Sequence, residues 1–245
     1  MTKETRLIMG MPITICIVDK EISNKIVDEV FDYFIHIDET FSPYKESSEV
    51  SKINRKEISE KDYSEEMKEV LNLSELTKQE SHGYFDVFYN NKFNPSGLVK
   101  GWAIWKASKI LDKHNVKNYF IDAGGDIQTK GFNDEGKKWS VGIKDPWKQE
   151  NIVKTVYLSG EGIATSGTYI RGEHIYDPIN KKNCTEIASI SIIAKNIYEA
   201  DRMATSAFVM GEQGIYFIEN LPGFEGFQIN NDKIGIMTTD FENFT

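Results

Sequence analysis

The sequence predicts an α+β fold, with mixed sheets and with helices concentrated in the N-terminal half of a single compact body that could have two lobes. Segments with apolar residues at helical spacing lie mostly before Asn115, while short β-rich runs separated by turn residues fill most of the remainder. Helices and strands therefore do not alternate as they do in a regularly wound parallel sheet. Because no internal repeat or low-complexity linker divides the chain, we expect residues 1–245 to form one domain.

Apolar spacing and capping residues place four helices in the N-terminal half. The first follows a β-rich run and presents Ile26, Val30 and Phe34 on one face. Ser64 is expected to cap a later helix, because two glutamates follow it in the electropositive first turn. A long aromatic-bearing loop then leads to the turn Pro95-Ser96-Gly97, where another helix opens. The expected helices are 21–38, a short helix within 41–54, 64–81 and 98–114.

Turn residues divide the second half into short strands. Asn133-Asp134-Glu135-Gly136 and Asp145-Pro146 are turn signals, and Asn230-Asn231-Asp232 is expected at the tip of a hairpin. The run IASISIIA has the strongest β character in the chain. The expected strands are 11–19, 118–124, 125–131, 138–146, 153–160, 162–170, 173–178, 187–194 and the hairpin 227–238.

Composition excludes several functional classes. The net charge is 29 − 38 = −9 with no long basic run, which argues against a nucleic-acid partner held by phosphate contacts. Cys16 and Cys184 do not form a disulfide framework or match zinc spacing, and Cys16 lies in a run typical of a buried strand. The chain shows no signal-peptide pattern and no apolar run of membrane-spanning length, so we expect a cytoplasmic protein. The sequence leaves open whether an export signal was removed from the chain beforehand.

A predicted helix at 196–211 carries the first candidate site. Asn196 can cap it, Glu199 can complete a capping box, and Gly211 can end it. Asp201 and Thr205 are four residues apart, so both oxygens lie on one face, about 40° apart around the helix. A carboxylate and a hydroxyl suit a hard cation such as Mg²⁺. The alternative is a solvated aspartate and a threonine inside the helix.

Two glycine-bearing turns are further candidates. In the stretch Asn94 to Gly101, a helix opens with Lys100 in its first turn, and the backbone N–H groups of such a turn attract phosphate. It is not a P-loop, because GxxxxGK[ST] is absent. The stretch Asp122 to Asp126 contains a glycine pair, which either lets the backbone approach a ligand or makes a bulge, the default expectation.

One histidine and a set of loop residues complete the candidates. His174 could take a proton from a hydroxyl near neutral pH, although a lone histidine is more often structural. Met9, Tyr44, Tyr84 and Phe85 lie beside turns, outside the regular apolar stripes. Flat apolar groups on loops suit an isoalloxazine or adenine ring, or they simply pack.

The order of these clusters resembles the ApbE family of FAD:protein FMN transferases over nearly the whole chain. Nine stretches carry the resemblance, and their agreement in order makes a chance match improbable. They are MGMP, FSPYKESSEVSKIN, GYFDV, SGLVKGWA, DAGGDI, WSVGIKDPW, IATSGTYI, HIYDP and EADRMATSAFVMG.

The resemblance implies a reaction and a metal site. Members of this family bind FAD with Mg²⁺ and transfer its FMN half to a Thr or Ser hydroxyl of an acceptor flavoprotein, with release of AMP. The resemblance assigns the metal to Asp201, Thr205 and the backbone carbonyl of Gly97. It places Lys100 beside the diphosphate and makes His174 the base for the acceptor hydroxyl.

The resemblance also implies which residues contact the cofactor-like substrate, and it leaves alternatives open. The chain departs from the family pattern at Asn94 and Trp105, where aspartate is usual, and at 179–181 after HIYDP. A Mg²⁺-dependent FAD pyrophosphatase that uses water, and a non-catalytic FAD-binding protein, are the competing hypotheses. The residues expected to contact FAD are Met9, Tyr44, Tyr84, Phe85, Asp86, Asn94, Lys100 and Ile175.

Overall fold

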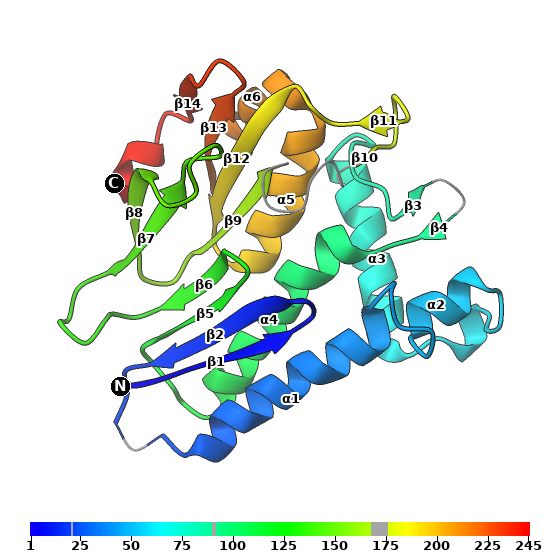
Figure 1. Ribbon diagram of the computed structural model, residues 1–245, viewed down its shortest axis with the longest axis horizontal. Helices are drawn as coiled ribbons and strands as arrows, with labels where there is room; N and C mark the ends of the chain where they lie inside the picture. The colour runs from blue at the N-terminus through cyan, green and yellow to red at the C-terminus, as the bar shows by residue number, and fades with distance from the viewer. Residues whose placement is uncertain (21, 90–91, 168–175) are drawn as a thin grey trace.

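The centre of the molecule is an eight-stranded sheet in which each neighbouring pair of strands runs antiparallel (Figure 1). The computed structural model describes residues 1–20, 22–89, 92–167 and 176–245. In order across the sheet, the strands are β1 (Thr2–Ile8), β2 (Met11–Ile17), β5 (Tyr119–Ala123), β6 (Asp126–Lys130), β9 (Gly162–Gly167), β12 (Ile187–Ala194), β13 (Phe224–Asn230) and β14 (Gly235–Met237).

Helices cover one face of this sheet, where the main hydrophobic core lies (Figure 1). The N-terminal helices are α1 (Asn24–Phe41), α2 (Glu49–Asn54), α3 (Glu65–Glu80) and α4 (Ser96–Lys113). The C-terminal ones are α5 (Ile197–Val209) and α6 (Gly214–Glu219). Helix α5 packs against β9 and β12, and α4 packs against α5, so α4 and α5 lie side by side.

A hairpin covers part of the opposite face. Strands β7 (Trp139–Lys144) and β8 (Ile152–Leu158) pair with each other and, with the short helix η3 (Phe241–Phe244), enclose a second, smaller core. Strand β12 is buried along its whole length because it lies between both cores. Its residues alternate accordingly, with Ile192 in the main core and Ile193 in the second.

Two further hairpins lie near the C-terminal end of α5 and the N-terminal end of α4 (Figure 1). One joins β3 (Phe88–Tyr89) to β4 (Lys92–Phe93), and the other joins β10 (Tyr176–Asp177) to β11 (Lys182–Asn183). Both consist of two-residue strands. They matter here because they contribute aromatic side chains to the cavity described below.

The predicted fold class is confirmed: the molecule is one mixed α and β body with most helices in the first half. The helices at 64–81 and 196–211 and the strand at 187–194 form within two residues of the expected bounds. Strand β1, the β3–β4 hairpin and α6 were not predicted. Strand β1 lies at the sheet edge and lacks a fully buried residue, so its apolar pattern is weak. The other elements are too short to show a period.

Two of the compositional expectations concern the cysteines and membrane association. Cys16 and Cys184 are both buried free thiols, as expected for residues without a disulfide partner. Burial raises the pKa of Cys184 to about 12, so this thiol stays protonated at neutral pH. Within the described ranges, no helix combines the length and hydropathy that crossing a bilayer requires.

Candidate active site

Helix α5 is fixed to the sheet at its first turn. Asn196 Oδ1 accepts a hydrogen bond from the Glu199 N–H at 3.0 Å, which confirms the expected N-cap. The Ile197 N–H donates to Gln128 Oε1 on β6 at 2.9 Å, so a second orphan donor of this helix end is also satisfied. The Glu199 carboxylate accepts from Arg202 Nε at 2.8 Å, and among these described residues it forms no reciprocal capping box with Asn196, contrary to the expectation.

Two glycines on α4 allow it to touch α5. A Cβ atom at Gly101 would lie 2.5 Å from Asp201 Cβ and 2.8 Å from the Ile197 carbonyl oxygen, distances that no side chain tolerates. A Cβ at Gly97 would lie 3.3 Å from Thr205 Cγ2. With glycine there, the Gly101 N–H donates to Asp201 Oδ2 at 2.7 Å. The first turns of α4 therefore meet α5 at the two predicted metal ligands.

This contact gathers three oxygen donors that the sequence separates. Thr205 Oγ1 lies 3.4 Å from the carbonyl oxygen of Gly97, and Asp201 lies one turn earlier on the same face of α5. A carboxylate, a hydroxyl and a carbonyl are the ligand types that Mg²⁺ takes in proteins. In the part of the chain that the structure describes, no group of three or more His, Cys, Asp and Glu side chains offers an alternative. The donor set therefore fits a hard cation.

Two buried carboxylates share one ammonium beside these donors. Asp201 is 4 % exposed and Asp126 is 2 % exposed. Lys100 Nζ forms an ion pair with Asp126 Oδ2 and lies 3.7 Å from Asp201 Oδ1. Burial raises the pKa of Asp201 to about 7, and the negative charge of Asp126 adds to this, while Lys100 and the Gly101 N–H oppose it. With both carboxylates ionised, the cluster is one positive charge short, which favours binding of a cation.

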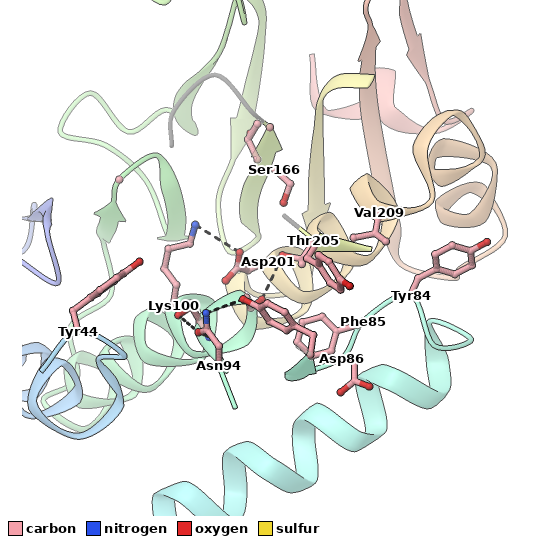
Figure 2. Close-up of a pocket in the computed structure, with 17 residues that line it drawn as sticks. Tyr44, Tyr84, Phe85, Asp86, Asn94, Lys100, Ser166, Asp201, Thr205 and Val209 are labelled. Carbon is pink, nitrogen blue, oxygen red and sulfur yellow. Dashed lines mark hydrogen bonds and ion pairs between the residues drawn. The ribbon is translucent and has the colours of Figure 1, made fainter. Parts of the chain in front are cut away.

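The cluster opens into a cavity of about 420 Å³ (Figure 2). In the figure, Lys100, Asp201 and Thr205 lie together at the centre of the view, while Tyr44 and Tyr84 lie on opposite sides of them. The cavity is lined by Tyr44, Tyr84, Phe85, Asp86, Tyr89, Asn94, Ser96, Gly97, Lys100, Gly124, Thr165, Ser166, Gly167, Tyr176, Asp201, Thr205 and Val209.

An aromatic pair forms part of the cavity wall. The rings of Tyr89 and Tyr176 stack with centroids 5.2 Å apart and an interplanar angle of 21°. Asn94 Nδ2 donates to Tyr89 Oη at 3.0 Å, and Asn94 Oδ1 accepts from the Ser96 N–H at 3.1 Å. Asn94 therefore connects the start of α4 to the aromatic pair. A carboxylate at this position would lack the N–H₂ group that makes the first of these bonds.

The run Tyr84-Phe85-Asp86 is held by the end of α3. The Phe85 N–H donates to Ser81 Oγ at 3.0 Å. Asp86 forms an ion pair with Lys78 at 2.7 Å, and its other oxygen accepts from the Phe88 N–H at 2.8 Å. Both oxygens of this carboxylate are therefore engaged by protein groups, and the loop before the β3–β4 hairpin is anchored at two points.

The structure gathers most of the predicted site residues around one cavity, but not all of them. Met9 is not among the lining residues; it sits at φ 56° in the β1–β2 turn and packs against the main core. His174 and Ile175 lie outside the described residues. The residues that line the cavity as expected are Tyr44, Tyr84, Phe85, Asp86, Asn94, Gly97, Lys100, Asp201 and Thr205. Their individual roles stay predictions.

Several cavity residues were not predicted. The glycine pair is a two-residue hairpin turn rather than the bulge expected by default, because Ala123 pairs directly with Asp126 and both glycines have positive φ. The turn places Asp126 beside Lys100. No local pattern signals this pairing, or the stacking of two tyrosines from different hairpins. Tyr89 lies outside every candidate stretch, and the other added residues lie within candidate or family-like stretches but had been assigned no role individually. The residues that the structure adds to the site are Tyr89, Ser96, Gly124, Asp126, Thr165, Ser166, Gly167, Tyr176 and Val209.

Several curated proteins that are similar in sequence to this chain share one name. A protein of Vibrio cholerae named FAD:protein FMN transferase is 31% identical over 128 residues, which are 48% of this chain and 38% of that protein. One of Haemophilus influenzae with the same name is 34% identical over 128 residues, 48% of this chain and 37% of that protein. The matched stretches thus span about two fifths of these curated relatives. One of Chlamydia muridarum is 25% identical and covers 84% of this chain and 81% of that protein.

Solved structures share the fold. The flavin transferase ApbE from Vibrio cholerae superposes with a TM-score of 0.87 at 20% identity, covering 100% of this chain and 99% of that one. The ApbE protein from Thermotoga maritima gives a TM-score of 0.88 at 22% identity, covering 99% and 98%. A sequence model described as the ApbE family matches residues 9–94 and 89–227. This chain belongs to the ApbE family.

Proposed function

We propose that this chain is a Mg²⁺-dependent FAD:protein FMN transferase, which transfers the FMN moiety of FAD to a Thr or Ser hydroxyl of an acceptor protein. The observation that carries the proposal is the meeting of Asp201, Thr205, the Gly97 carbonyl and Lys100 at one cavity with aromatic walls. A dinucleotide with a flat ring and a diphosphate requires both kinds of surface. The curated relatives are named FAD:protein FMN transferase, which supports this proposal.

The reaction exchanges the phosphoanhydride bond between the two halves of FAD for a phosphoester bond to the acceptor. The acceptor oxygen forms a bond to the phosphorus on the FMN side of the diphosphate, and the bond from that phosphorus to the AMP oxygen breaks. The hydroxyl proton passes to a base, and AMP leaves with its phosphate. We propose His174 as that base on the family resemblance alone. When bound, Mg²⁺ would supply positive charge to the diphosphate.

Other residues of the chain would bind the cation, the phosphates and a ring of FAD. Asp201, Thr205 and the Gly97 carbonyl would hold the cation, and Lys100 would place its ammonium beside the phosphates, where negative charge accumulates as the AMP oxygen departs. The tyrosine pair and Phe85 would orient a ring of FAD. The acceptor is a flavoprotein by this proposal, and a cytoplasmic location stays a prediction that cell fractionation would test.

The test is to incubate the protein with FAD, Mg²⁺ and a candidate acceptor that carries the Thr-containing motif of the family. A fluorescent acceptor band on a denaturing gel, with an intact-mass gain of one FMN less water, is the expected result. An acceptor in which that Thr is replaced by Val is the matched control and should stay unlabelled.

Two other outcomes would contradict the proposal. If AMP and FMN accumulate without a labelled acceptor, the protein is a FAD pyrophosphatase that uses water in place of the hydroxyl. If FAD binds and no product forms at any Mg²⁺ concentration with several acceptors, the protein is a FAD-binding protein without this activity. The same incubation, analysed by chromatography, separates these two cases.

A further inference from the structure

Asp126 is a buried carboxylate that the sheet places beside the candidate metal site. It is the first residue of β6, directly after the Gly124-Gly125 turn, and it is 2 % exposed. Its Oδ1 accepts from the Thr165 N–H of β9 at 3.2 Å, and its Oδ2 forms an ion pair with Lys100. Two strands therefore determine where its negative charge lies.

The ammonium of Lys100 lies between two carboxylates and is closer to one of them than to the other. It is in contact with Asp126, whereas it lies 3.7 Å from Asp201 Oδ1. The other oxygen of Asp201 already accepts the Gly101 N–H at 2.7 Å. A cation bound by Asp201 would therefore use Oδ1, the atom that the ammonium would neutralise if it moved closer. In a poorly solvated cluster, the position of one ammonium decides which carboxylate remains available.

We propose that Asp126 is a positioning residue that holds the Lys100 ammonium away from Asp201. This keeps Asp201 Oδ1 for the metal and leaves the ammonium beside the substrate diphosphate. The inference rests on the proposed function, because it concerns the same metal and phosphate site. It assigns Asp126 no contact with metal or substrate: the residue acts through Lys100.

The proposal makes a specific prediction for Asp126→Asn. Asparagine keeps the size of the side chain and an oxygen for the Thr165 N–H, and it removes the charge. Lys100 would then move onto Asp201 and compete with the cation, so the affinity for Mg²⁺ should fall about tenfold. The measurement is calorimetric titration of Mg²⁺ in the presence of ADP, which carries the diphosphate but no flavin and cannot be a donor of FMN.

A double-mutant cycle isolates the route of the effect. In a Lys100→Met background no ammonium can compete, so adding Asp126→Asn should change the Mg²⁺ affinity less than twofold. The matched control is Asp122→Asn in the same hairpin, a carboxylate whose contact is with the Gly125 N–H, and it should leave Mg²⁺ affinity unchanged. If Asp126→Asn does not fold by circular dichroism, Asp126→Ser, which retains a small hydrogen-bond acceptor, carries the same cycle.

Other results would overturn the proposal in different ways. A tenfold loss that persists in the Lys100→Met background would mean that Asp126 acts on the metal site directly, through its own charge beside Asp201 or as a ligand, and not through Lys100. A lower melting temperature with unchanged Mg²⁺ affinity would make it a structural residue only. If the unmodified protein with ADP binds no Mg²⁺, the metal site of the proposed function fails and this inference fails with it. Acceptor labelling is a separate measurement, so loss of the inference alone leaves the proposed transferase activity testable.

Discussion

The two sides of the cavity are built differently. On the side of the candidate metal ligands, called the metal side below, α4 and α5 are in close contact at Gly101, and the charged groups of Asp126 and Asp201 are almost fully buried. On the aromatic side, the walls come from short hairpins and loops, and Tyr44 is 93 % exposed. One side is therefore enclosed by packed helices, and the other is more open to solvent.

This difference separates two demands on one site. Charges that neutralise a diphosphate must be placed closely and kept from water, and long helices that share a glycine contact provide a rigid frame for this. A ring needs only flat apolar surfaces, and stacked tyrosines on hairpins supply them. We therefore expect changes on the metal side to reduce the reaction rate or the stability strongly, and changes on the aromatic side to reduce substrate affinity moderately.

The largest expected effect is that of Asp201→Asn. The variant keeps an acceptor for the Gly101 N–H but loses the charge that the cation requires, so the rate of acceptor labelling should fall by at least about 100-fold. The measurement is the initial labelling rate as a function of Mg²⁺ concentration. Asp32→Asn, an exposed carboxylate on α1, is the control and should behave as the unmodified protein. An unaltered Mg²⁺ dependence in Asp201→Asn would remove this residue from the metal site.

The contact between α4 and α5 can be broken directly with Gly101→Ala. The added methyl group would lie 2.5 Å from Asp201 Cβ, so the helices must separate, and we expect a loss of about 2 kcal/mol in the free energy of unfolding. Urea denaturation measures this. Gly160→Ala is the control, because no atom lies within 4 Å of the new methyl group there. Equal stability of the two variants would show that the helices do not need this close approach.

The metal side should also respond to pH. Because the pKa of Asp201 is raised to about 7, this group is protonated in the metal-free protein below that pH, and protons then compete with Mg²⁺. Affinity for Mg²⁺ should therefore rise about tenfold from pH 6 to pH 8 and level off above. Calorimetric titration at four pH values measures it. A flat profile would mean that Asp201 stays ionised without the metal.

The smallest expected effect lies on the aromatic side. Tyr89→Leu removes the stack on Tyr176 and the bond from Asn94, which should cost about 1 kcal/mol of binding, or about fivefold in the KM for FAD. The maximal rate and Mg²⁺ affinity should stay unchanged, which separates the two sides of the cavity. Tyr216→Leu, an exposed tyrosine of α6, is the control. A loss of Mg²⁺ affinity in Tyr89→Leu would show that the two sides of the cavity are coupled, contrary to this comparison.

Local signals in the sequence account for much of the fold. Ser64 and Asn196 were expected to cap helices, and their side-chain oxygens do accept N–H groups of the first turn. The run 187–194 forms a strand with the expected bounds. Helix caps and β-branched runs depend on interactions within a few residues, so they can be recognised in the sequence.

Some features were not predictable because they depend on the neighbours that a segment acquires. Strand β1 has weak periodicity and becomes a strand by pairing with β2. The glycine pair was expected to form a bulge, yet the register of β5 and β6 makes it a tight turn. Met9, which was expected to contact FAD, packs against the main core and is not among the residues that line the cavity.

The sequence by itself determined the longer helices and the main strands. It also determined that Asp201 and Thr205 share one face, because helical geometry puts residues four apart on the same side. It also carried the family resemblance. Only the tertiary structure decided that Lys100 pairs with Asp126 and that tyrosines of two hairpins stack, and it brings the Gly97 carbonyl, which the resemblance had implied, close to Thr205. These contacts join segments far apart in the chain, and they depend on packing of the whole sheet against α4 and α5.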